Sequence, residues 1–204
     1  NYADGIKGYY YAKLSDGSIA MGSVGRGIGI RDMPLTDKGK WEFKDSSKGY
    51  LFENALTIVE DSFKRIWSGR LNKGIAVYDR LKDTVFSLAI KSFEGFGIEA
   101  GVCDKYGNVW LGGNGLHFFR NKRDIDVSKI SFKDFIPIKS DIFTSEDKKI
   151  YAMTIVKGRY LLIGTQKGLG IINIDKFYSN KGQDILFFNN ENGFSGAACE
   201  QNTI

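Results

Sequence analysis

The chain has 204 residues, of which 42% are hydrophobic and 14% aromatic, with 25 glycines and only 2 prolines. This composition excludes a disordered chain and fits many short strands joined by glycine turns. No run of 18 apolar residues is present, so no membrane-spanning helix is expected. The formal net charge of +5 is spread along the sequence, which favours a solvated face over a nucleic-acid site.

Short apolar segments bounded by Gly and Asp occur in four successive groups of four. They are rich in Val, Ile and aromatic residues, which is typical of strands in antiparallel meanders. A helix is expected for one turn at most, at residues 144–148. The expected strands are 9–14, 18–23, 27–31 and 41–44; 56–60, 65–69, 75–78 and 85–90; 98–103, 109–112, 116–119 and 130–136; and 151–156, 160–165, 169–174 and 185–188.

The second strand of each group contains a glycine that directly follows an apolar segment. These glycines are Gly22, Gly69, Gly112 and Gly164, at intervals of 47, 43 and 52 residues. A period of about 40–50 residues indicates propeller blades or solenoid units. A polar turn precedes three of the copies, at 16–17, 61–64 and 104–107.

The second strands are almost wholly apolar, which predicts burial on both faces. Radially stacked sheets provide such burial, and a glycine without a Cβ atom lets neighbouring backbones approach closely. We therefore predict an all-β fold with four four-stranded antiparallel propeller blades. The alternative is a β-sandwich with accidental similarity between its segments.

The segment around Gly5 resembles the segment around Gly193, 188 residues later, which is four times 47. We therefore divide the chain into blades at 4–48, 49–94, 95–143 and 144–191, with the start of a further blade at 192–204. The whole chain is interpreted as part of one propeller.

Several motifs for catalysis or cofactors fail on their residue types. Gly69 and Gly74 have the spacing of a phosphate-binding loop, but Ile75 occupies the place of the required lysine. Residues 25–29 are rich in glycine but have no helix behind them, so no dinucleotide site is expected. Glu60 and Asp61 are strand neighbours that point to opposite faces, so they do not form a two-carboxylate site.

The single histidine and the two cysteines are expected to be structural. His117 lies within a third strand and has no spaced metal-ligating partner, so a packed or half-exposed position is expected. Cys103 and Cys199 show neither metal nor disulfide spacing, and Cys103 is expected to be a buried free thiol. We predict no catalytic residue, no metal and no cofactor.

Residues 58–69 (IVEDSFKRIWSG), which run on to 74–79, and residues 102–112 (VCDKYGNVWLG) carry the repeat most clearly. Together with the segments around Gly5 and Gly193, they resemble the two-component regulator propeller repeat. The first copy departs from the pattern, since Ala20 and Met21 replace the Ile-Trp pair, and Arg70 replaces the usual Thr.

That resemblance implies the periplasmic sensor portion of a hybrid histidine kinase, found especially in Bacteroidetes. It implies a seven-bladed ring, with a membrane helix and the kinase in a later segment that is absent here. The ligands of the family are chiefly carbohydrates, and the family offers no catalytic motif.

The resemblance leads us to expect a non-enzymatic module that senses an oligosaccharide. A propeller lyase or lactonase is the first alternative, although such an enzyme needs a metal or a His/Glu pair at its axis. A propeller that docks another protein is the second. Because a partial ring leaves a blade face open at each end, we also expect either self-association through the sides around Tyr9 and Ile185 or a lower stability than that of a longer piece of the ring.

The ligand is expected on the turns between second and third strands. These turns should emerge at the same end of the sheets as the connections between blades, whereas the third-to-fourth connections around 122–129 and 178–183 should lie at the other end. Function concentrates on loops carried by a rigid scaffold. The expected ligand-binding residues are Arg26, Arg70, Asn72, Lys73, Asn114, Gln166 and Lys167.

Overall fold

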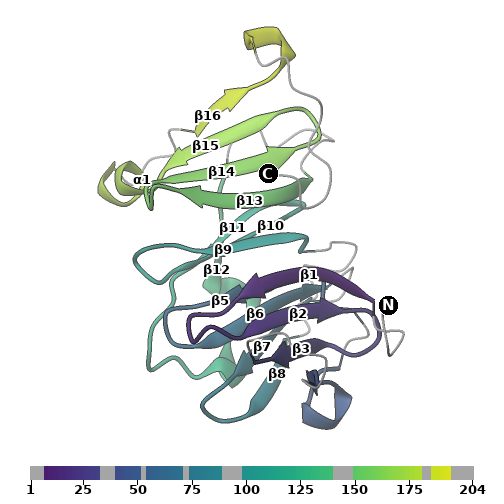
Figure 1. Cartoon of the computed structure of the whole chain (residues 1–204). Helices are drawn as coiled ribbons and strands as arrows, with labels where there is room; N and C mark the ends of the chain where they lie inside the picture. Colours follow the sequence, from purple (N-terminus) through teal and green to yellow (C-terminus); the bar gives the residue numbers. More distant parts are fainter. Residues whose placement is uncertain are drawn as a thin grey trace. The chain divides into compact units, whose positions relative to one another are not determined.

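The structure, a computed structural model, describes residues 7–32, 40–51, 54–70, 74–88, 98–139, 149–180 and 185–193. These residues form four antiparallel sheets of four strands each, and in every sheet the strands lie side by side in chain order (Figure 1). We call the sheets blades 1 to 4, because such a meander is the repeating unit of a propeller. The predicted all-β fold class is confirmed.

The strands follow the predicted repeat, but those expected at 56–60 and 98–103 are shorter and begin only at Val59 and Ala100. Blade 1 contains β1 (Gly8–Lys13), β2 (Ile19–Ser23), β3 (Ile28–Arg31) and β4 (Glu42–Lys44), and blade 2 contains β5 (Val59–Glu60), β6 (Arg65–Arg70), β7 (Gly74–Asp79) and β8 (Thr84–Leu88). Blade 3 contains β9 (Ala100–Cys103), β10 (Val109–Gly113), β11 (Gly115–Phe119) and β12 (Phe135–Pro137), and blade 4 contains β13 (Ile150–Val156), β14 (Tyr160–Thr165), β15 (Leu169–Asn173) and β16 (Ile185–Phe188).

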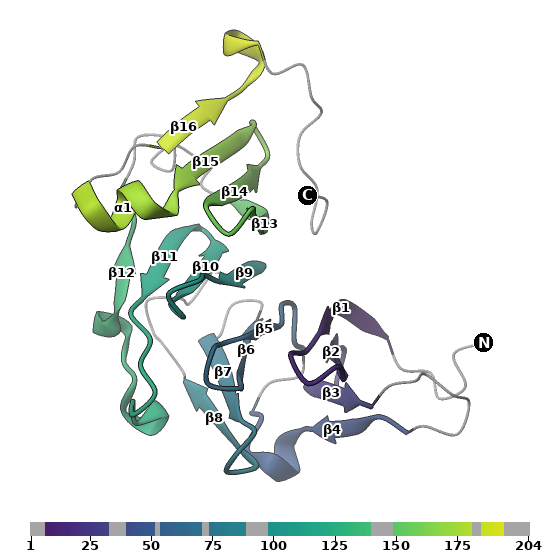
Figure 2. The same ribbon diagram turned by 60° about the vertical axis from the view of Figure 1, so that its left-hand side comes forward.

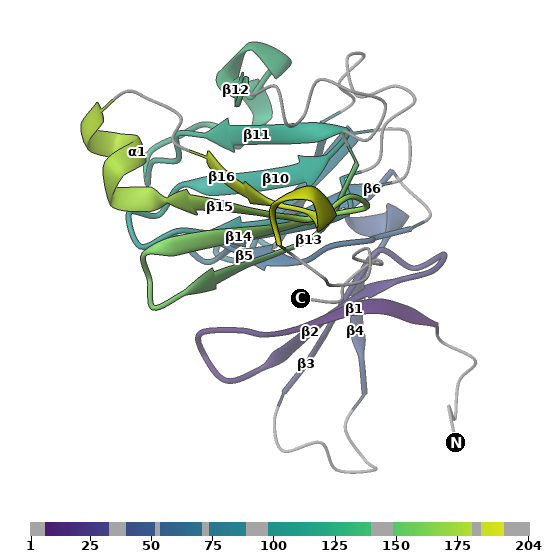
Figure 3. The ribbon, with the colours of Figure 1, turned by 90° about the horizontal axis from the view of Figure 1, so that it is seen from above.

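Helical segments are short, as expected, but their places differ from the prediction. The strand expected at 130–136 is reduced to Phe135–Pro137, because the 3-10 turns η3 (Val127–Lys129) and η4 (Phe132–Asp134) precede it. The helix α1 (Ile174–Asn180) directly follows β15, where only a loop was expected (Figure 3). The helical turn expected at 144–148 lies outside the described residues.

Two compact units are present, each built on two blades. The first comprises residues 1–98 and 122–132 and holds blades 1 and 2, whereas the second comprises 99–121 and 133–204 and holds blades 3 and 4. In Figure 2 the individual strands of each blade can be distinguished. The core of the first unit is formed by Leu14, Ala20, Ile28, Tyr50, Ala55, Ile58, Ile66, Ala76, Tyr78 and Val85. The core of the second is formed by Ala100, Trp110, Leu116, Phe118, Ile138, Ile150, Met153, Leu161, Ile163, Ile172 and Ile174.

The second strands are buried as predicted. Trp67 in β6 and Trp110 in β10 are fully buried, at 0% exposure. In β14 of blade 4 burial is less complete, because Leu162 is half-buried and Tyr160 is exposed. The burial predicted from apolar composition is therefore most complete in the second strands of blades 2 and 3.

The repeat glycines of the first three second strands contact the chain that enters the next blade. A Cβ atom on Gly69 would lie 2.5 Å from the carbonyl oxygen of Ile98, and one on Gly22 would overlap the carbonyl oxygen of Ala55. In the second unit, a Cβ atom on Gly112 would lie 2.6 Å from Cγ2 of Ile150. The predicted reason for these glycines, close backbone approach, is therefore confirmed at Gly22 and Gly69, whereas at Gly112 the close neighbour is a side chain.

A buried Asp–Trp pair fixes the first-to-second turn in blades 2 and 3. In blade 2, Oδ1 of Asp61 accepts backbone N–H bonds from Phe63 and Arg65, and Oδ2 accepts a bond of 2.8 Å from the Trp67 indole. In blade 3, Asp104 accepts the same three kinds of bond, with the Trp110 indole again at 2.8 Å. One carboxylate thus closes the turn and satisfies the buried indole N–H.

Third-to-fourth connections reach the first-to-second turn of the preceding blade. Between β7 and β8, the Arg80 guanidinium pairs with Asp16 in the β1–β2 turn. The segment between β11 and β12 offers the Lys122 carbonyl to Arg65 at 2.8 Å, and the Tyr178 hydroxyl in α1 donates to Asp104 at 2.6 Å. These contacts confirm the prediction that the third-to-fourth connections lie at the same end of the sheets as the first-to-second turns.

Candidate functional site

In each unit, the turn between second and third strands lies beside the chain that enters the next blade. In the first unit, Val24 forms an antiparallel bridge with Asn54, and the backbone N–H of Ala55 donates to the Ser23 carbonyl at 3.0 Å. In the second unit, Asn114 forms the equivalent bridge with Lys149. We call this end of the sheets the connection end; it is the end on which the ligand-binding turns are expected.

At the connection end of the first unit, Arg26 is exposed and lies over the Phe43 ring, with Cζ 4.3 Å from the centroid. This cation–π contact holds the guanidinium near the sheet while leaving its donors available. Arg70 ends β6, where only its backbone is described. Asn72 and Lys73 lie outside the described residues.

The second unit brings three expected site residues close to one lysine. Asn114 is bridged to Lys149, and the next residue, Ile150, pairs with Thr165, which directly precedes Gln166 and Lys167. The side chains of Asn114, Gln166 and Lys167 are all exposed. Lys149 therefore lies between the turns of blades 3 and 4 that were expected to bind a ligand.

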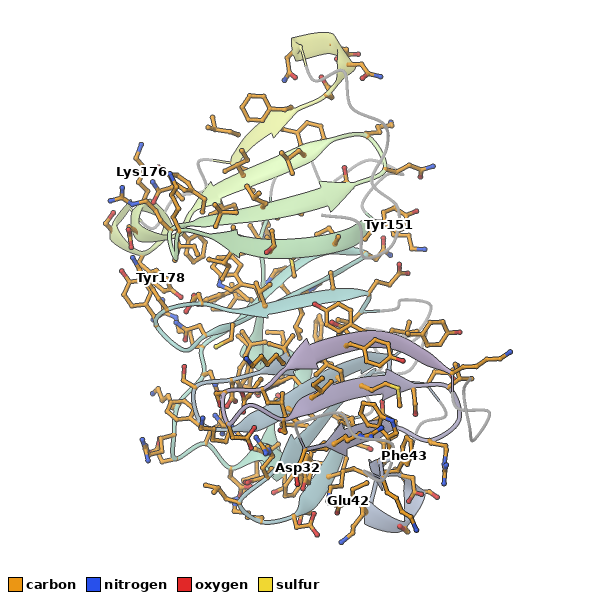
Figure 4. All side chains as sticks on the ribbon, viewed as in Figure 1. Asp32, Glu42, Phe43, Tyr151, Lys176 and Tyr178 are labelled. Atoms are coloured by element: carbon orange, nitrogen blue, oxygen red, sulfur yellow. The ribbon has the colours of Figure 1, made fainter. Side chains whose placement is uncertain are left out.

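Lys149 is held from two directions. Its ammonium lies 3.0 Å from Oε1 of Glu99, and it lies 4.8 Å from the centroid of the Tyr151 ring. We call Glu99, Asn114, Lys149 and Tyr151, with the neighbouring Gln166 and Lys167, the Lys149 cluster. Figure 4 shows Tyr151 at the start of β13, whereas Lys176 and Tyr178 lie near the other end of that strand.

The two members of the ion pair differ in exposure. The side chain of Glu99 is 6% exposed and that of Lys149 is 49% exposed. A buried carboxylate is costly without a partner, so Glu99 has a strong requirement for the ammonium beside it. About half of the lysine side chain is exposed to solvent, so its ammonium can also donate to an anion or a hydroxyl group.

A β-bulge sets the direction of Tyr151. Ile150 pairs with Thr165 and Ala152 pairs with Gly164, which leaves Tyr151 as the extra residue. In β1, the same irregularity between Gly8 and Tyr10 isolates Tyr9. Bulges change the direction of a side chain, and here each bulge lies at a tyrosine that is the second residue of its strand, β1 or β13.

The sequence-based choice of site residues missed Glu99, Lys149 and Tyr151. Two signals were available in the sequence. Tyr9 and Tyr151 occupy the same position of the repeat, and Glu99 occupies that position in blade 3. A carboxylate at a repeat position filled elsewhere by apolar or aromatic residues would have marked blade 3 as different.

His117 is half-buried in β11, as the sequence predicted. Burial lowers the pKa of its imidazole below the ordinary value, so the ring is neutral at pH 7. Within the described ranges, no group of three or more His, Cys, Asp or Glu side chains is placed to hold a metal ion.

Cys103 is a free thiol, but it is half-buried rather than buried as expected. It lies at the last residue of β9, where its thiol donates to the Asp104 carbonyl at 3.6 Å. The terminal position on the strand explains the partial exposure. Cys199 lies outside the described residues.

Among the described residues, no helix is long and apolar enough to span a membrane. No protein-family model matches the sequence, and no curated protein matches it.

Solved structures nevertheless match the fold. One is described as the extracellular domain of a hybrid two-component system from B. thetaiotaomicron, with a TM-score of 0.65 and 17% identity over 94% of this chain and 23% of that chain. A second domain of this description from B. thetaiotaomicron gives a TM-score of 0.64 and 22% identity over 89% of this chain and 23% of that chain. This chain therefore shares its fold with part of each of these domains and spans about a quarter of their length.

Proposed function

We propose that the chain is part of an extracytoplasmic propeller that senses a glycan or oligosaccharide for a hybrid two-component system. The observation that carries this proposal is the match of fold to extracellular domains of two such systems, over 89–94% of the chain. In this proposal the domain is periplasmic and acts on a cytoplasmic histidine kinase through a membrane segment outside this chain.

The connection end of each unit is a proposed ligand surface. Exposed hydrogen-bonding side chains are present at both, with Arg26 in the first unit and the Lys149 cluster in the second. Guanidinium, ammonium and amide groups donate to the hydroxyl and carboxylate oxygens of sugars. The other end is rich in ion pairs between the chain's own side chains, such as those of Arg80 with Asp16 and Glu60.

Signalling requires that the ligand binds one arrangement of the sensor better than another. A ligand shifts an equilibrium only by its difference in affinity for the two arrangements. We propose that oligosaccharide binding changes the spacing or orientation of a dimer and so biases the kinase.

Self-association is part of this proposal. In blade 1, β1 exposes Tyr9 and Tyr11 at 45% and 53%, and in blade 4, β16 exposes Leu186 and Phe188 at 60% and 37%. Exposed aromatic and aliphatic side chains of this size favour a protein contact. Sedimentation of the wild-type chain should show concentration-dependent association, and Leu186→Lys should weaken it. A strict monomer at all concentrations would exclude this part of the proposal.

A glycan array tests the ligand class directly. Binding to one glycan class, with at least about tenfold loss on Arg70→Ala, would support the connection end, since 1.4 kcal/mol corresponds to tenfold in affinity. Unchanged affinity in Arg70→Ala, together with a loss from substitutions at 122–129, would move the site to the other end of the sheets. Turnover of a glycan, instead of binding alone, would favour a propeller enzyme.

A further inference from the structure

We propose that the Lys149 cluster binds an anionic sugar, with the sugar's carboxylate or sulfate group on Lys149 and its ring against Tyr151. This inference rests on the proposed glycan-sensing function and names the chemical class of the ligand. At the connection end of the second unit, the positive and negative side chains differ in their exposure.

The charge that solvent meets in the cluster is positive. Lys149 is half exposed and Lys167 is exposed, whereas the carboxylate of Glu99 is 6% exposed. An incoming ligand therefore meets two ammonium groups before it meets the carboxylate. Opposite charge at a partly buried site attracts an anion and excludes a second cation.

Glu99 acts as a positioning residue for Lys149. It lies between Ile98 and Ala100, which are 1% and 3% exposed, and its backbone N–H donates to the Gly112 carbonyl at 2.9 Å. The carboxylate is thereby fixed to the sheet, and it holds the lysine ammonium 3.0 Å away. A lysine that is already ordered loses less side-chain entropy when it binds a ligand.

Tyr151 and Asn114 add the features that favour a sugar over a simple anion. The Tyr151 ring lies 4.8 Å from the lysine ammonium, so a ligand that contacts Lys149 also reaches an aromatic surface. A pyranose ring presents an apolar C–H face that packs on such a ring, while its hydroxyl groups bond to polar neighbours. The exposed amide of Asn114, on the residue bridged to Lys149, can both donate to and accept from those hydroxyls.

The chain provides a matched control for the lysine. Lys176 is exposed on α1, near the end of β13 opposite to Tyr151 (Figure 4). Lys176→Gln and Lys149→Gln make the same change of charge in the same unit, so a general electrostatic effect would appear in both variants.

The experiment is titration calorimetry of the chain with three tetrasaccharides: tetragalacturonate, a 6-sulfated galactose tetramer and the neutral galactose tetramer. We expect at least one acidic tetramer to bind at least about tenfold more tightly than the neutral one, and the affinities of the two acidic tetramers identify the anionic group. Lys149→Gln should weaken acidic binding about tenfold or more, whereas Lys176→Gln should change it less than about twofold. Tyr151→Leu should weaken binding and Tyr151→Phe should retain it, because the ring and not the hydroxyl group is required.

Three results would overturn the inference: no binding of either acidic tetramer, equal affinity for the neutral and acidic tetramers, or Lys149→Gln that binds like the wild type. Binding of neutral glycans alone would leave the sensing function in place and remove only the anionic ligand. Absence of binding to every glycan on the array would instead remove the proposed function itself.

Discussion

The first-to-second turns of blades 2 and 3 differ from those of blades 1 and 4 in one pair of residues. Blades 2 and 3 carry Asp with Trp, as Asp61 with Trp67 and Asp104 with Trp110. The equivalent pairs elsewhere are Leu14 with Ala20 in blade 1 and Val156 with Leu162 in blade 4.

The backbone of the turn is nevertheless shared. Leu14 closes its turn through backbone bonds with Ser18 and Gly17, as Asp61 does with Arg65 and Lys64. The aspartate is therefore not required to form the turn. It is present where an indole is buried, because a buried indole N–H needs an acceptor and a buried carboxylate needs donors.

The largest expected effect is the loss of either indole. Trp67→Ala and Trp110→Ala should each lower the free energy of unfolding by about 3–5 kcal/mol, because a large buried side chain is lost and a cavity remains. Denaturant titration measures this loss. Leu81→Ala, at a position that is 84% exposed, is the control and should cost far less. A cost below about 1 kcal/mol in the Trp variants would contradict their role in the core.

The two Asp–Trp turns differ in the further side chain that donates to the aspartate. Asp61 pairs with the Arg65 guanidinium at 2.8 Å, and both side chains are at most 3% exposed, whereas Asp104 accepts from the neutral Tyr178 hydroxyl. Arg65→Met removes the counterion of a buried carboxylate and should cost about 3–5 kcal/mol. Tyr178→Phe removes one neutral hydrogen bond and should cost about 0.5–1.5 kcal/mol. Equal losses of unfolding free energy in the two variants, measured by denaturant unfolding, would show that the charge of the guanidinium adds nothing to stability beyond its hydrogen bond.

Converting blade 3 to the apolar type tests whether Asp and Trp act together. Asp104→Val leaves the Trp110 indole without its acceptor, and Trp110→Leu leaves Asp104 with one donor fewer. The double variant removes both needs at once, so its loss of unfolding free energy should be about 0.5–3 kcal/mol smaller than the sum of the single losses. Strict additivity in a double-mutant cycle would mean that the two residues are independent.

A smaller effect is expected at the left-handed position of the turn. Lys64 has φ of +66°, where blades 1 and 3 have Gly17 at +92° and Gly107 at +85°. A side chain is strained in this region, so Lys64→Gly should raise the free energy of unfolding by about 0.5–1 kcal/mol. Lys64→Ala is the control, since it retains the strain; a gain of the same size in that variant would attribute the effect to the lysine side chain.

The smallest effect concerns Asp175, which joins the blade 3 turn to α1. Hydrogen bonds from Lys105 first, and then from Tyr106 and Arg159, lower the pKa of Asp175 to about 2. Its ordinary value is about 3.9, so its contribution to stability is full above about pH 4 and is lost as the pH falls towards 2. Carboxyl NMR titration, with Asp175→Asn to identify the resonance, should give this low midpoint. A midpoint near 4 would show that the contacts with the turn and with Arg159 do not persist in solution.

The sequence predicted the strands well because burial and turn chemistry leave a local pattern. Short, almost wholly apolar segments bounded by polar turns and glycine are sufficient to place β10 and β14 within one residue. The helix α1 was missed because it is only seven residues long and is positioned by packing, with the Phe177 ring 4.8 Å from the Trp110 ring. Packing between distant segments has no local signature.

The candidate site was predicted only in part for the same reason. Asn114, Gln166 and Lys167 follow from knowing which turns share an end of the sheets. Glu99 and Lys149 are 50 positions apart, and their pairing depends on how blade 4 enters beside blade 3. The orientation of Tyr151 depends on a bulge, which no residue type in the sequence specifies.

The contacts between each third-to-fourth connection and the preceding turn also bear on how the chain folds during synthesis. Tyr178 reaches Asp104 from 74 positions later, Lys122 reaches Arg65 from 57 positions later, and Arg80 reaches Asp16 from 64 positions later. Each separation exceeds the repeat intervals of 43–52 residues. Because domains fold from the N-terminus as they leave the ribosome, each new turn waits for the following blade before its polar groups are satisfied. A nascent chain arrested after β9 would therefore hold Arg65 without the Lys122 carbonyl, and protease protection of blade 2 should rise only when residue 122 has emerged.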